Sequence, residues 1–517
     1  MIQLTVKEDL VRRSLALLLA PLLLLPATAS PATAASAASA PSASAEAQAA
    51  SITYRTIPGE GGAPLRAFVV APTGSGPHPL LVMPSSWAVS GIEYVGAAAK
   101  LAYRSGYAVI SYTSRGFHDS GGEIDVAGTA TVADVSRVID WGITNLDADP
   151  ARIGVAGISY GGGQSLLAAA ADPRVRAVAA LSTWSDLARS LYPNETVSSQ
   201  AVDLLLTAGK LTGRPGQVLR DAETAYREGR FEDVVPISPP RSPSTKVPAL
   251  SRAAVLIGNA WNDGLFPPGQ ITDLFSELTG PKRLLLTPGD HATAELFGAA
   301  GLPNEVWDAV GRWFDHHLRG VANGVDREAP VWLRPNNGGA WRTYPSWSAV
   351  TTARESLPLA EAGFGAGRAT LADSGAVLVS GALQAFLKIP TGVALPLVDR
   401  SGAAVWTGPV LRSTTLVGGT PRARLNVTAA AETSLFAYLY EVNGLGLGAL
   451  ISHKPVVVRA GSRVVDLELE PALWQVGAGN RLALVVDTVD GRYGSVGTRG
   501  AAVTIGAGSV LEVPISG

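Results

Sequence analysis

A serine stands between two glycines in the segment Gly157-Ile158-Ser159-Tyr160-Gly161, between an expected strand over residues 152–156 and an expected helix of small residues. A sharp strand-to-helix turn holds a serine in a strained backbone conformation, and only glycines leave room around it. The turn would place the Ser159 hydroxyl near the positive end of the helix, where a developing alkoxide is favoured. The pattern predicts a nucleophilic serine; the alternative is an incidental serine in a glycine-rich turn.

A serine hydroxyl is a weak nucleophile at neutral pH, so it needs a base that a third group holds in place. Hydrolases of the α/β type supply these groups in the chain order Ser, Asp or Glu, His. Asp263 follows an expected strand over residues 253–257, and His291 follows the next strand, over residues 283–287. Both strand ends should lie on the same edge of the sheet as Ser159. The order therefore predicts that His291 is the base and that Asp263 orients it.

The six histidines and the neighbouring acids offer few alternatives. His118 also follows an expected strand, but it precedes the serine and so breaks the order. Asp290 could be the orienting acid, although a residue rarely reaches the Nδ1 atom of the histidine beside it. His316 and His317 are adjacent on an expected helix and point to different faces, so we predict no metal site.

The elements that must position these side chains alternate between strand and helix from residue 52 to about residue 319, which is typical of an α/β sheet. Residues 184–240 break the alternation, and we expect a helical cap over about 184–250. From about residue 331, short period-two segments between glycine-rich turns predict a β-sandwich. The predicted fold class is an α/β-hydrolase core with a helical cap insertion over residues 51–325, plus an all-β jelly-roll C-terminal domain over residues 330–517.

Composition excludes several classes of function. The net charge of −2 gives no indication of a nucleic-acid partner. The absence of cysteine excludes disulfides, thiolate metal sites and a cysteine nucleophile.

The first fifty residues indicate export. Basic residues precede an apolar run over residues 15–25, and small-residue cleavage sites follow it. We predict a signal peptide over residues 1–34 and a disordered Ala/Ser/Pro-rich spacer over residues 35–50. The mature protein would be secreted or extracytoplasmic, without stable membrane insertion; an uncleaved N-terminal anchor is the alternative.

Several motifs together resemble the Xaa-Pro dipeptidyl-peptidase and cocaine-esterase-like hydrolases. They are the serine motif extended to Gly162, Ser114-Arg115-Gly116 with Ser120-Gly121-Gly122-Glu123, Trp261-Asn262-Asp263-Gly264, and a β-rich tail with Leu467-x-Leu469-x-Pro471 and Gly479-x-Arg481-Leu482. The resemblance covers about residues 52–515. It implies an α/β-hydrolase core, a helical cap and a jelly-roll domain, with Ser159 as nucleophile, Asp263 as orienting acid and His291 as base and then acid.

The oxyanion hole should include the backbone N–H of Tyr160 and a donor from the loop Pro84-Ser85-Ser86-Trp87. Members of the family often place a tyrosine hydroxyl at the position that Ser85 occupies here. We expect Ser85 as the second donor, with the Ser86 hydroxyl or a rearrangement around Trp87 as alternatives.

For substrate binding we predict Trp87, together with Trp184 and Leu265, which the resemblance suggests as walls of an acyl pocket; ordinary packing is the alternative for the last two.

The sequence thus predicts a secreted serine hydrolase that cleaves an ester, or an amide in a short peptide, through an acyl-enzyme and without a cofactor. The resemblance supports ester and Xaa-Pro substrates equally. A noncatalytic extracellular binding protein built on the β-sandwich and a metal-dependent hydrolase are the alternatives, and the oligomeric state stays open.

Overall fold

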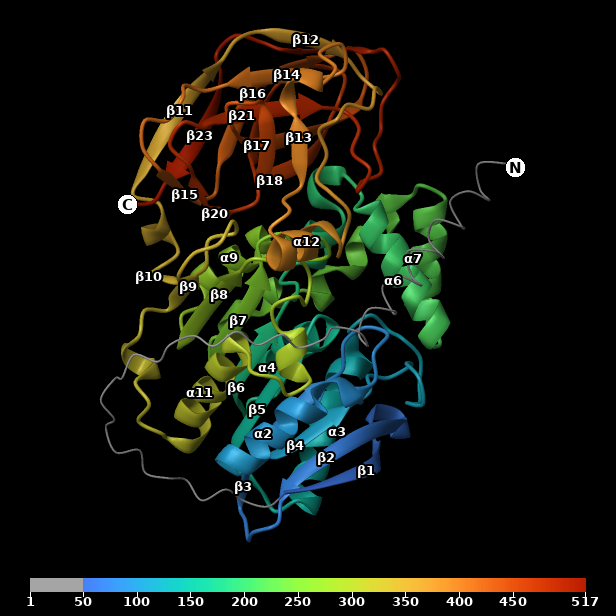
Figure 1. Ribbon diagram of the computed structural model, residues 1–517. Helices are drawn as coiled ribbons and strands as arrows, with labels where there is room; N and C mark the ends of the chain where they lie inside the picture. Colours follow the sequence, from blue (N-terminus) through green and yellow to red (C-terminus); the bar gives the residue numbers. More distant parts are fainter. Residues whose placement is uncertain (1–49) are drawn as a thin grey trace. The chain divides into compact units, whose positions relative to one another are not determined.

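The computed structural model describes residues 50–517 (Figure 1). The predicted signal peptide over residues 1–34 and all but the last residue of the predicted spacer lie outside the described residues. Within the described range, no helix is both long enough and apolar enough to cross a membrane.

The first part of the described chain forms a ten-stranded mixed sheet in the order β1-β2-β4-β3-β5-β6-β7-β8-β9-β10. The strands from β4 to β9 in this order are parallel, and β1, β2 and β10 pair antiparallel with their neighbours. The central strands are nearly continuous runs of buried residues, as expected for a parallel sheet that is covered on both faces. The strands are β1 (Ala50–Pro58), β2 (Pro64–Pro72), β3 (His78–Pro84), β4 (Ala108–Tyr112), β5 (Ala148–Ile158), β6 (Val175–Leu181), β7 (Ala254–Ala260), β8 (Lys282–Thr287), β9 (Val331–Leu333) and β10 (Arg342–Tyr344).

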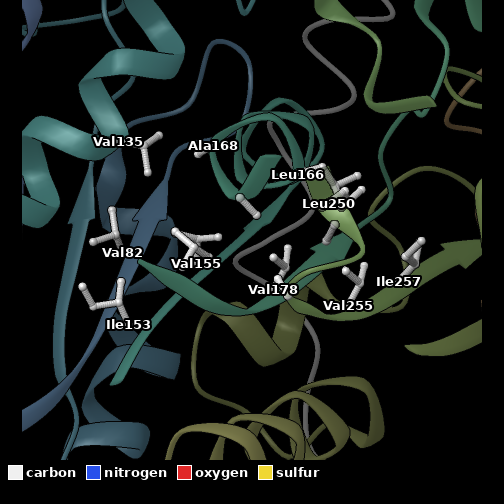
Figure 2. Packing of buried hydrophobic residues seen from close by; sticks show 14 of the residues in the cluster. Val82, Val135, Ile153, Val155, Leu166, Ala168, Val178, Leu250, Val255 and Ile257 are labelled. Carbon is white, nitrogen blue, oxygen red and sulfur yellow. The ribbon is translucent and has the colours of Figure 1, made fainter. Parts of the chain in front are cut away.

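Helices cover both faces of this sheet (Figure 1). On one face, apolar residues of α3, α4 and α9 pack against alternate strand residues, and Figure 2 shows Val135, Leu166 and Ala168 above Val155 and Val178. On the other face, α2, α10 and α11 form a separate core. These helices are α2 (Val95–Ser105), α3 (Thr129–Asn145), α4 (Tyr160–Ala171), α9 (Pro268–Glu277), α10 (Leu296–Ala299) and α11 (Glu305–Arg319).

An all-helical insertion separates β6 from β7, where the sequence predicts a cap. It contains α5 (Leu187–Leu191), α6 (Ser199–Thr212), α7 (Gln217–Arg227) and α8 (Val247–Leu250), with four short 3-10 turns between residues 231 and 246. The helix α7 is amphipathic, with Leu219 and Ala225 buried and Arg220, Asp221 and Arg227 exposed, as expected for a helix that covers an apolar surface.

The last part of the described chain forms two antiparallel sheets. One contains eight strands, with β12-β22-β16-β23-β15-β20 in order, β11 beside β23 and β19 beside β16; the other has the order β13-β18-β17-β21-β14. The strand β16 alternates exposed and buried residues, as expected where one face of a sheet meets the core. The strands are β11 (Ala353–Leu359), β12 (Ala362–Gly365), β13 (Gly392–Ala394), β14 (Ala404–Thr407), β15 (Thr415–Gly419), β16 (Arg422–Ala429), β17 (Thr433–Val442), β18 (Leu447–Val458), β19 (Gly461–Glu468), β20 (Ala472–Val476), β21 (Arg481–Asp487), β22 (Ala502–Ile505) and β23 (Ser509–Ile515).

One helix, α12 (Ser380–Leu387), interrupts the strands of this second part. The sequence pattern, read as strands alone in this part, does not predict it. The predicted fold class is confirmed: an α/β core with a helical insertion is followed by an all-β domain.

Candidate active site

Ser159 lies at the turn from β5 into α4, with φ 57° and ψ −121°. This region is unfavourable for a residue with a Cβ atom and is typical of a nucleophile elbow. Two glycines make the turn possible: a Cβ atom on Gly157 would lie 2.4 Å from the carbonyl carbon of Gly161, and one on Gly161 would lie 2.1 Å from the Pro84 oxygen. The Ser159 N–H donates to the Leu181 carbonyl at 2.8 Å, which fixes the turn to the end of β6.

The structure brings Ser159, His291 and Asp263 together. The His291 Nε2 atom lies 2.8 Å from Ser159 Oγ, and its Nδ1 atom lies 2.9 Å from Asp263 Oδ2 and 3.1 Å from Asp263 Oδ1. The three residues follow β5, β8 and β7, so each stands where a parallel strand ends. This geometry allows His291 to take the proton of the Ser159 hydroxyl while Asp263 holds the imidazole in one orientation.

The carboxylate of Asp263 is held by the backbone as well as by His291. Its Oδ1 atom accepts hydrogen bonds from the N–H groups of Leu265 (3.0 Å) and Phe266 (2.8 Å). Burial lowers the pKa of His291, but the charge and hydrogen bond of Asp263 outweigh burial, and the pKa lies above its ordinary value. Asp263 thus favours the protonated form of His291.

Two further carboxyl groups are buried behind His291. Burial raises the pKa of Glu295 to about 7, against the hydrogen bond with Ser182 and the charge of His291. Burial also raises the pKa of Asp290. Asp290, the alternative orienting acid, accepts a bond from the backbone N–H of His291 at 2.8 Å, whereas the imidazole bonds Asp263.

The other histidines considered in the sequence make contacts outside the group of Ser159, His291 and Asp263. The His118 Nε2 atom lies 2.9 Å from the Ala88 carbonyl oxygen. The rings of His316 and His317 meet edge-on, and burial lowers the pKa of His317 to about 4. Within residues 50–517, no group of three or more His, Cys, Asp or Glu side chains is arranged to hold a metal ion.

The loop after β3 does not place the Ser85 hydroxyl where we expected it. Ser85 is fully buried, and its Oγ atom accepts a bond from the Ser114 N–H at 3.0 Å and lies 3.3 Å from Ser114 Oγ. The Ser86 hydroxyl donates to the Ile158 carbonyl at 3.0 Å, and the Ser86 N–H donates to Glu93 at 2.6 Å. Because both serines bond the protein framework, neither hydroxyl supplies a donor to the serine pocket.

A pocket opens beside Ser159, with a volume of about 170 Å³. Most of its walls come from the elbow, the loop after β3 and the cap, and Val126 before α3 and Phe266 after β7 complete them. They contain no Asp, Glu, Lys or Arg within the described part of the chain, and the polar groups are serine and tyrosine hydroxyls and tryptophan N–H groups. The lining residues are Trp87, Val126, Ser159, Tyr160, Trp184, Leu187, Ala188, Leu191, Tyr192, Val197, Val202, Leu205, Leu206, Leu219, Ala222, Tyr226, Phe231, Val234, Val235, Ile237, Ser238 and Phe266.

Two of the three predicted pocket residues line this pocket. Trp184 stacks on Tyr160 with ring centroids 6.1 Å apart, and Trp87 meets the same ring edge-on at 5.1 Å. Leu265 is buried in the same apolar cluster as the pocket walls but does not line the pocket, and the next residue, Phe266, lines it instead. The Phe266 ring also meets His291 edge-on at 5.3 Å.

The chain matches two protein-family models. Residues 61–293 match the model described as X-Pro dipeptidyl-peptidase (S15 family), and residues 323–511 match the model of the X-Pro dipeptidyl-peptidase C-terminal non-catalytic domain. The chain belongs to this family of serine hydrolases. An Escherichia coli protein described as an uncharacterised 31.7 kDa protein in the traX-finO intergenic region is 26% identical over 270 residues, which are 48% of this chain and 94% of that protein.

Solved structures show the same fold at low sequence identity. An α-amino acid ester hydrolase superposes with a TM-score of 0.70 at 13% identity, covering 96% of this chain and 100% of that chain. A CocE/NonD family hydrolase from Staphylococcus aureus gives 0.67 at 13% identity, with 89% and 93% covered. An aminopeptidase from a Thaumarchaeota archaeon gives 0.64 at 13% identity, with 94% and 99% covered. The S15-family fold therefore occurs in structures that are named for ester and for peptide substrates.

Proposed function

We propose that this S15-family hydrolase is a carboxylic-ester hydrolase for apolar acyl groups and works through an acyl-enzyme on Ser159. The observation that carries the proposal is the pocket beside Ser159, whose walls are apolar and aromatic and hold no charged side chain among the described residues. An apolar acyl chain gains free energy by leaving water for such a pocket.

An Xaa-Pro peptide with a free amino terminus, or an α-amino acid ester, would bring an ammonium group to the site. Burying an ammonium group without a counter-charge costs far more free energy than the apolar contacts of the pocket contribute. Two carboxylates bond tyrosine hydroxyls of pocket residues: Glu232 accepts from the Tyr192 hydroxyl at 3.0 Å, and Asp203 accepts from the Tyr226 hydroxyl at 3.1 Å. Both pairs are exposed and neither carboxylate lines the pocket, so they do not form a buried ammonium site.

In the proposed mechanism, Ser159 Oγ attacks the ester carbonyl carbon while His291 Nε2 takes the hydroxyl proton. The tetrahedral oxyanion collapses, the ester C–O bond breaks, and His291 returns the proton to the leaving alcohol. A water molecule then attacks the acyl-enzyme, again with His291 as base, and releases the carboxylic acid and the free serine.

For the oxyanion hole we propose the backbone N–H groups of Tyr160 and Trp87. Tyr160 is the first residue of α4, where N–H groups have no partner within the helix. In the loop after β3, the Ser85 N–H donates to the Tyr112 carbonyl and the Ser86 N–H to Glu93, so Trp87 supplies the next N–H group, and its ring lines the pocket.

Purified protein would be assayed with p-nitrophenyl hexanoate and with an aminoacyl-proline p-nitroanilide, using Ser159→Ala as the blank. We expect turnover of the ester, loss of at least three orders of magnitude in Ser159→Ala, and little turnover of the anilide. A preference for the anilide that disappears when its amino group is acylated would show an exopeptidase instead.

We also keep secretion as a proposal, on the basis of the sequence of residues 1–34. Fractionation of cells that express the full chain, with the N-terminal sequence of the secreted form, tests it.

A further inference from the structure

The loop after β3 is closed by a side chain seven positions further along the chain. The Glu93 Oε1 atom accepts a hydrogen bond from the Ser86 N–H at 2.6 Å. Glu93 belongs to the short 3-10 helix η3 (Gly91–Tyr94), which follows this loop. The contact fixes the backbone directly before Trp87, whose N–H group is the second proposed oxyanion donor.

The carbonyl group of Ser86 is fixed as well. It accepts a hydrogen bond from the Val89 N–H at 3.2 Å. The Ser86 carbonyl and the Trp87 N–H belong to one peptide group, which is planar and has its N–H pointing away from its C=O. Because Glu93 bonds the N–H of Ser86 and Val89 bonds its carbonyl, the direction of the Trp87 N–H is fixed before a substrate binds.

The same loop and η3 are also bonded to the nucleophile elbow. The Ser86 hydroxyl donates to the Ile158 carbonyl at 3.0 Å, and the Ile158 N–H donates to the Tyr94 hydroxyl oxygen at 2.7 Å. Tyr94 follows Glu93 directly and is fully buried. Since Ile158 precedes Ser159, these bonds fix the loop relative to the nucleophile.

The helix η3 gives Glu93 a rigid base. The Gly91 N–H donates to Thr113 Oγ1 at 2.9 Å, and the Ser111 hydroxyl donates to the Gly91 carbonyl. A Cβ atom on Gly91 would lie 2.9 Å from the Ser111 carbonyl oxygen, so the helix packs closely against the end of β4. The position of the Glu93 side chain is therefore set by the sheet.

The bond between Glu93 and Ser86 does not depend on the charge of the carboxyl group. Burial raises the pKa of Glu93 to about 7, and the hydrogen bond from the Ser86 N–H opposes this effect. A carboxyl group keeps an acceptor oxygen for an N–H group whether it is ionised or protonated. An amide oxygen at the same position would also serve as the acceptor.

We propose that Glu93 is a positioning residue of the oxyanion hole: its side-chain oxygen holds the Ser86 N–H so that the next N–H group, that of Trp87, faces the oxyanion formed at Ser159. The proposal rests on the proposed function and deepens it. Glu93 does not line the pocket, so it does not contact the acyl group. Its loss should act on the transition state, in which the oxyanion exists, more than on the binding of the substrate.

The test compares two substitutions in the full chain. Glu93→Leu removes the acceptor oxygen, whereas Glu93→Gln keeps it. Glu441→Leu is the matched control, because Glu441 is also partly buried and accepts a hydrogen bond from a backbone N–H, that of Gly477 at 2.8 Å, but lies in the all-β domain.

Three quantities are measured for each variant: kcat and KM for p-nitrophenyl hexanoate, the inhibition constant of 1,1,1-trifluoro-2-heptanone, and that of 2-heptanone. Ser159 Oγ adds to the carbonyl carbon of the trifluoromethyl ketone, and the hydroxyl proton passes to His291 Nε2. The electron pair of the C=O π bond then becomes the charge of an oxyanion, which the oxyanion hole stabilises. The ketone 2-heptanone has the same alkyl chain but forms no stable adduct, so it reports on the pocket alone.

We expect Glu93→Leu to lower kcat about tenfold to a hundredfold and to raise the inhibition constant of the trifluoromethyl ketone by a similar factor. Its KM and its inhibition constant for 2-heptanone should stay within about threefold of the parent, since the pocket is unchanged. Glu93→Gln should stay within about threefold of the parent in every quantity, because the acceptor oxygen remains. Glu441→Leu should not change any of them.

A Glu93→Leu variant with the kcat and inhibition constants of Glu441→Leu would overturn the proposal. A Glu93→Gln variant as slow as Glu93→Leu would also overturn it, because the acceptor oxygen would then not be what matters. If Glu93→Leu does not fold, Glu93→Asp takes its place, since its shorter side chain draws the oxygen back from the Ser86 N–H: the same losses support the proposal and parental values overturn it.

Ser159→Ala separates this proposal from the proposed function. Ester turnover that persists in Ser159→Ala, or a parent that turns over only the anilide, refutes the proposed function. The inhibition constants of the two ketones still report on Glu93 when the parent prefers the anilide, because they depend on the oxyanion and not on the leaving group.

Discussion

The pocket beside Ser159 predicts how the rate should depend on the length of the acyl chain. An apolar cavity of about 150 Å³ in another protein holds a benzene molecule, so the pocket of about 170 Å³ has room for several methylene groups. Each buried methylene contributes about 0.8 kcal/mol. Four more methylenes, from acetyl to hexanoyl, would then stabilise the transition state by about 3 kcal/mol, which is a factor of about 200 in kcat/KM.

The assay is a series of p-nitrophenyl esters from acetate to dodecanoate, because the leaving group and its chemistry stay constant. We expect kcat/KM to rise steeply up to about six carbons and then to level off once the pocket is full. A parallel series of alkyl acetates varies only the alcohol. A rate that is flat along the acyl series, or that rises only along the alcohol series, would refute the assignment of the pocket to the acyl group.

A pair of variants on one helix tests whether this pocket determines the preferred length of the acyl chain. Leu206 lines the pocket and is 5% exposed, whereas Leu211 is 68% exposed on the same helix α6. Leu206→Trp should shorten the preferred chain by filling the pocket, and Leu211→Trp should leave the preference unchanged. An equal effect of both substitutions would mean that this pocket does not determine the preferred length of the acyl chain.

Three further outcomes follow from the site. Asp263→Asn should lower kcat/KM by about 10⁴-fold and move the acidic limb of the remaining activity to lower pH, because the carboxylate raises the pKa of the histidine base; a pH–rate profile measures both. Trp87→Ala and Trp87→Pro both remove the ring but only proline removes the N–H, so the proline variant should be about 10²-fold slower; equal rates would exclude this N–H as an oxyanion donor. Gly163→Ala should destabilise the protein by about 1–3 kcal/mol in urea unfolding because its Cβ would lie 2.2 Å from the Trp184 ring, whereas Gly311→Ala, with its nearest contact at 3.8 Å, should not.

The sequence was sufficient for the positions of Ser159, Asp263 and His291 because each depends on a local rule: a polar residue in the loop that follows a parallel strand stands at the edge where the strands end. The fold class could be predicted for a similar reason, since buried runs and helical periods are local patterns. Neither prediction requires knowing which residues that are far apart in the sequence contact each other.

The direction in which individual side chains point was harder to predict from the sequence. Leu265 and Phe266 are neighbours in one turn, and only the backbone path decides that Phe266 faces the pocket. The Ser85 hydroxyl oxygen accepts a hydrogen bond from the N–H of Ser114, which lies 29 positions further along the chain. No local sequence pattern predicts that pairing. Helix α12 is short and exposes apolar residues such as Phe386, so its sequence has no clear helical pattern.

The distribution of charge around His291 links the proposed substrate to the proposed mechanism. Asp263, Asp290 and Glu295 are buried behind the imidazole, and the charge of each favours a higher pKa of His291. The pocket in front of the imidazole carries no charged side chain within the described residues. A cationic substrate group would have to give up water there without a partner, whereas a neutral ester loses little. The same apolar surroundings strengthen the hydrogen bonds that the oxyanion accepts. One arrangement therefore selects against an ammonium group and favours the transition state of ester hydrolysis.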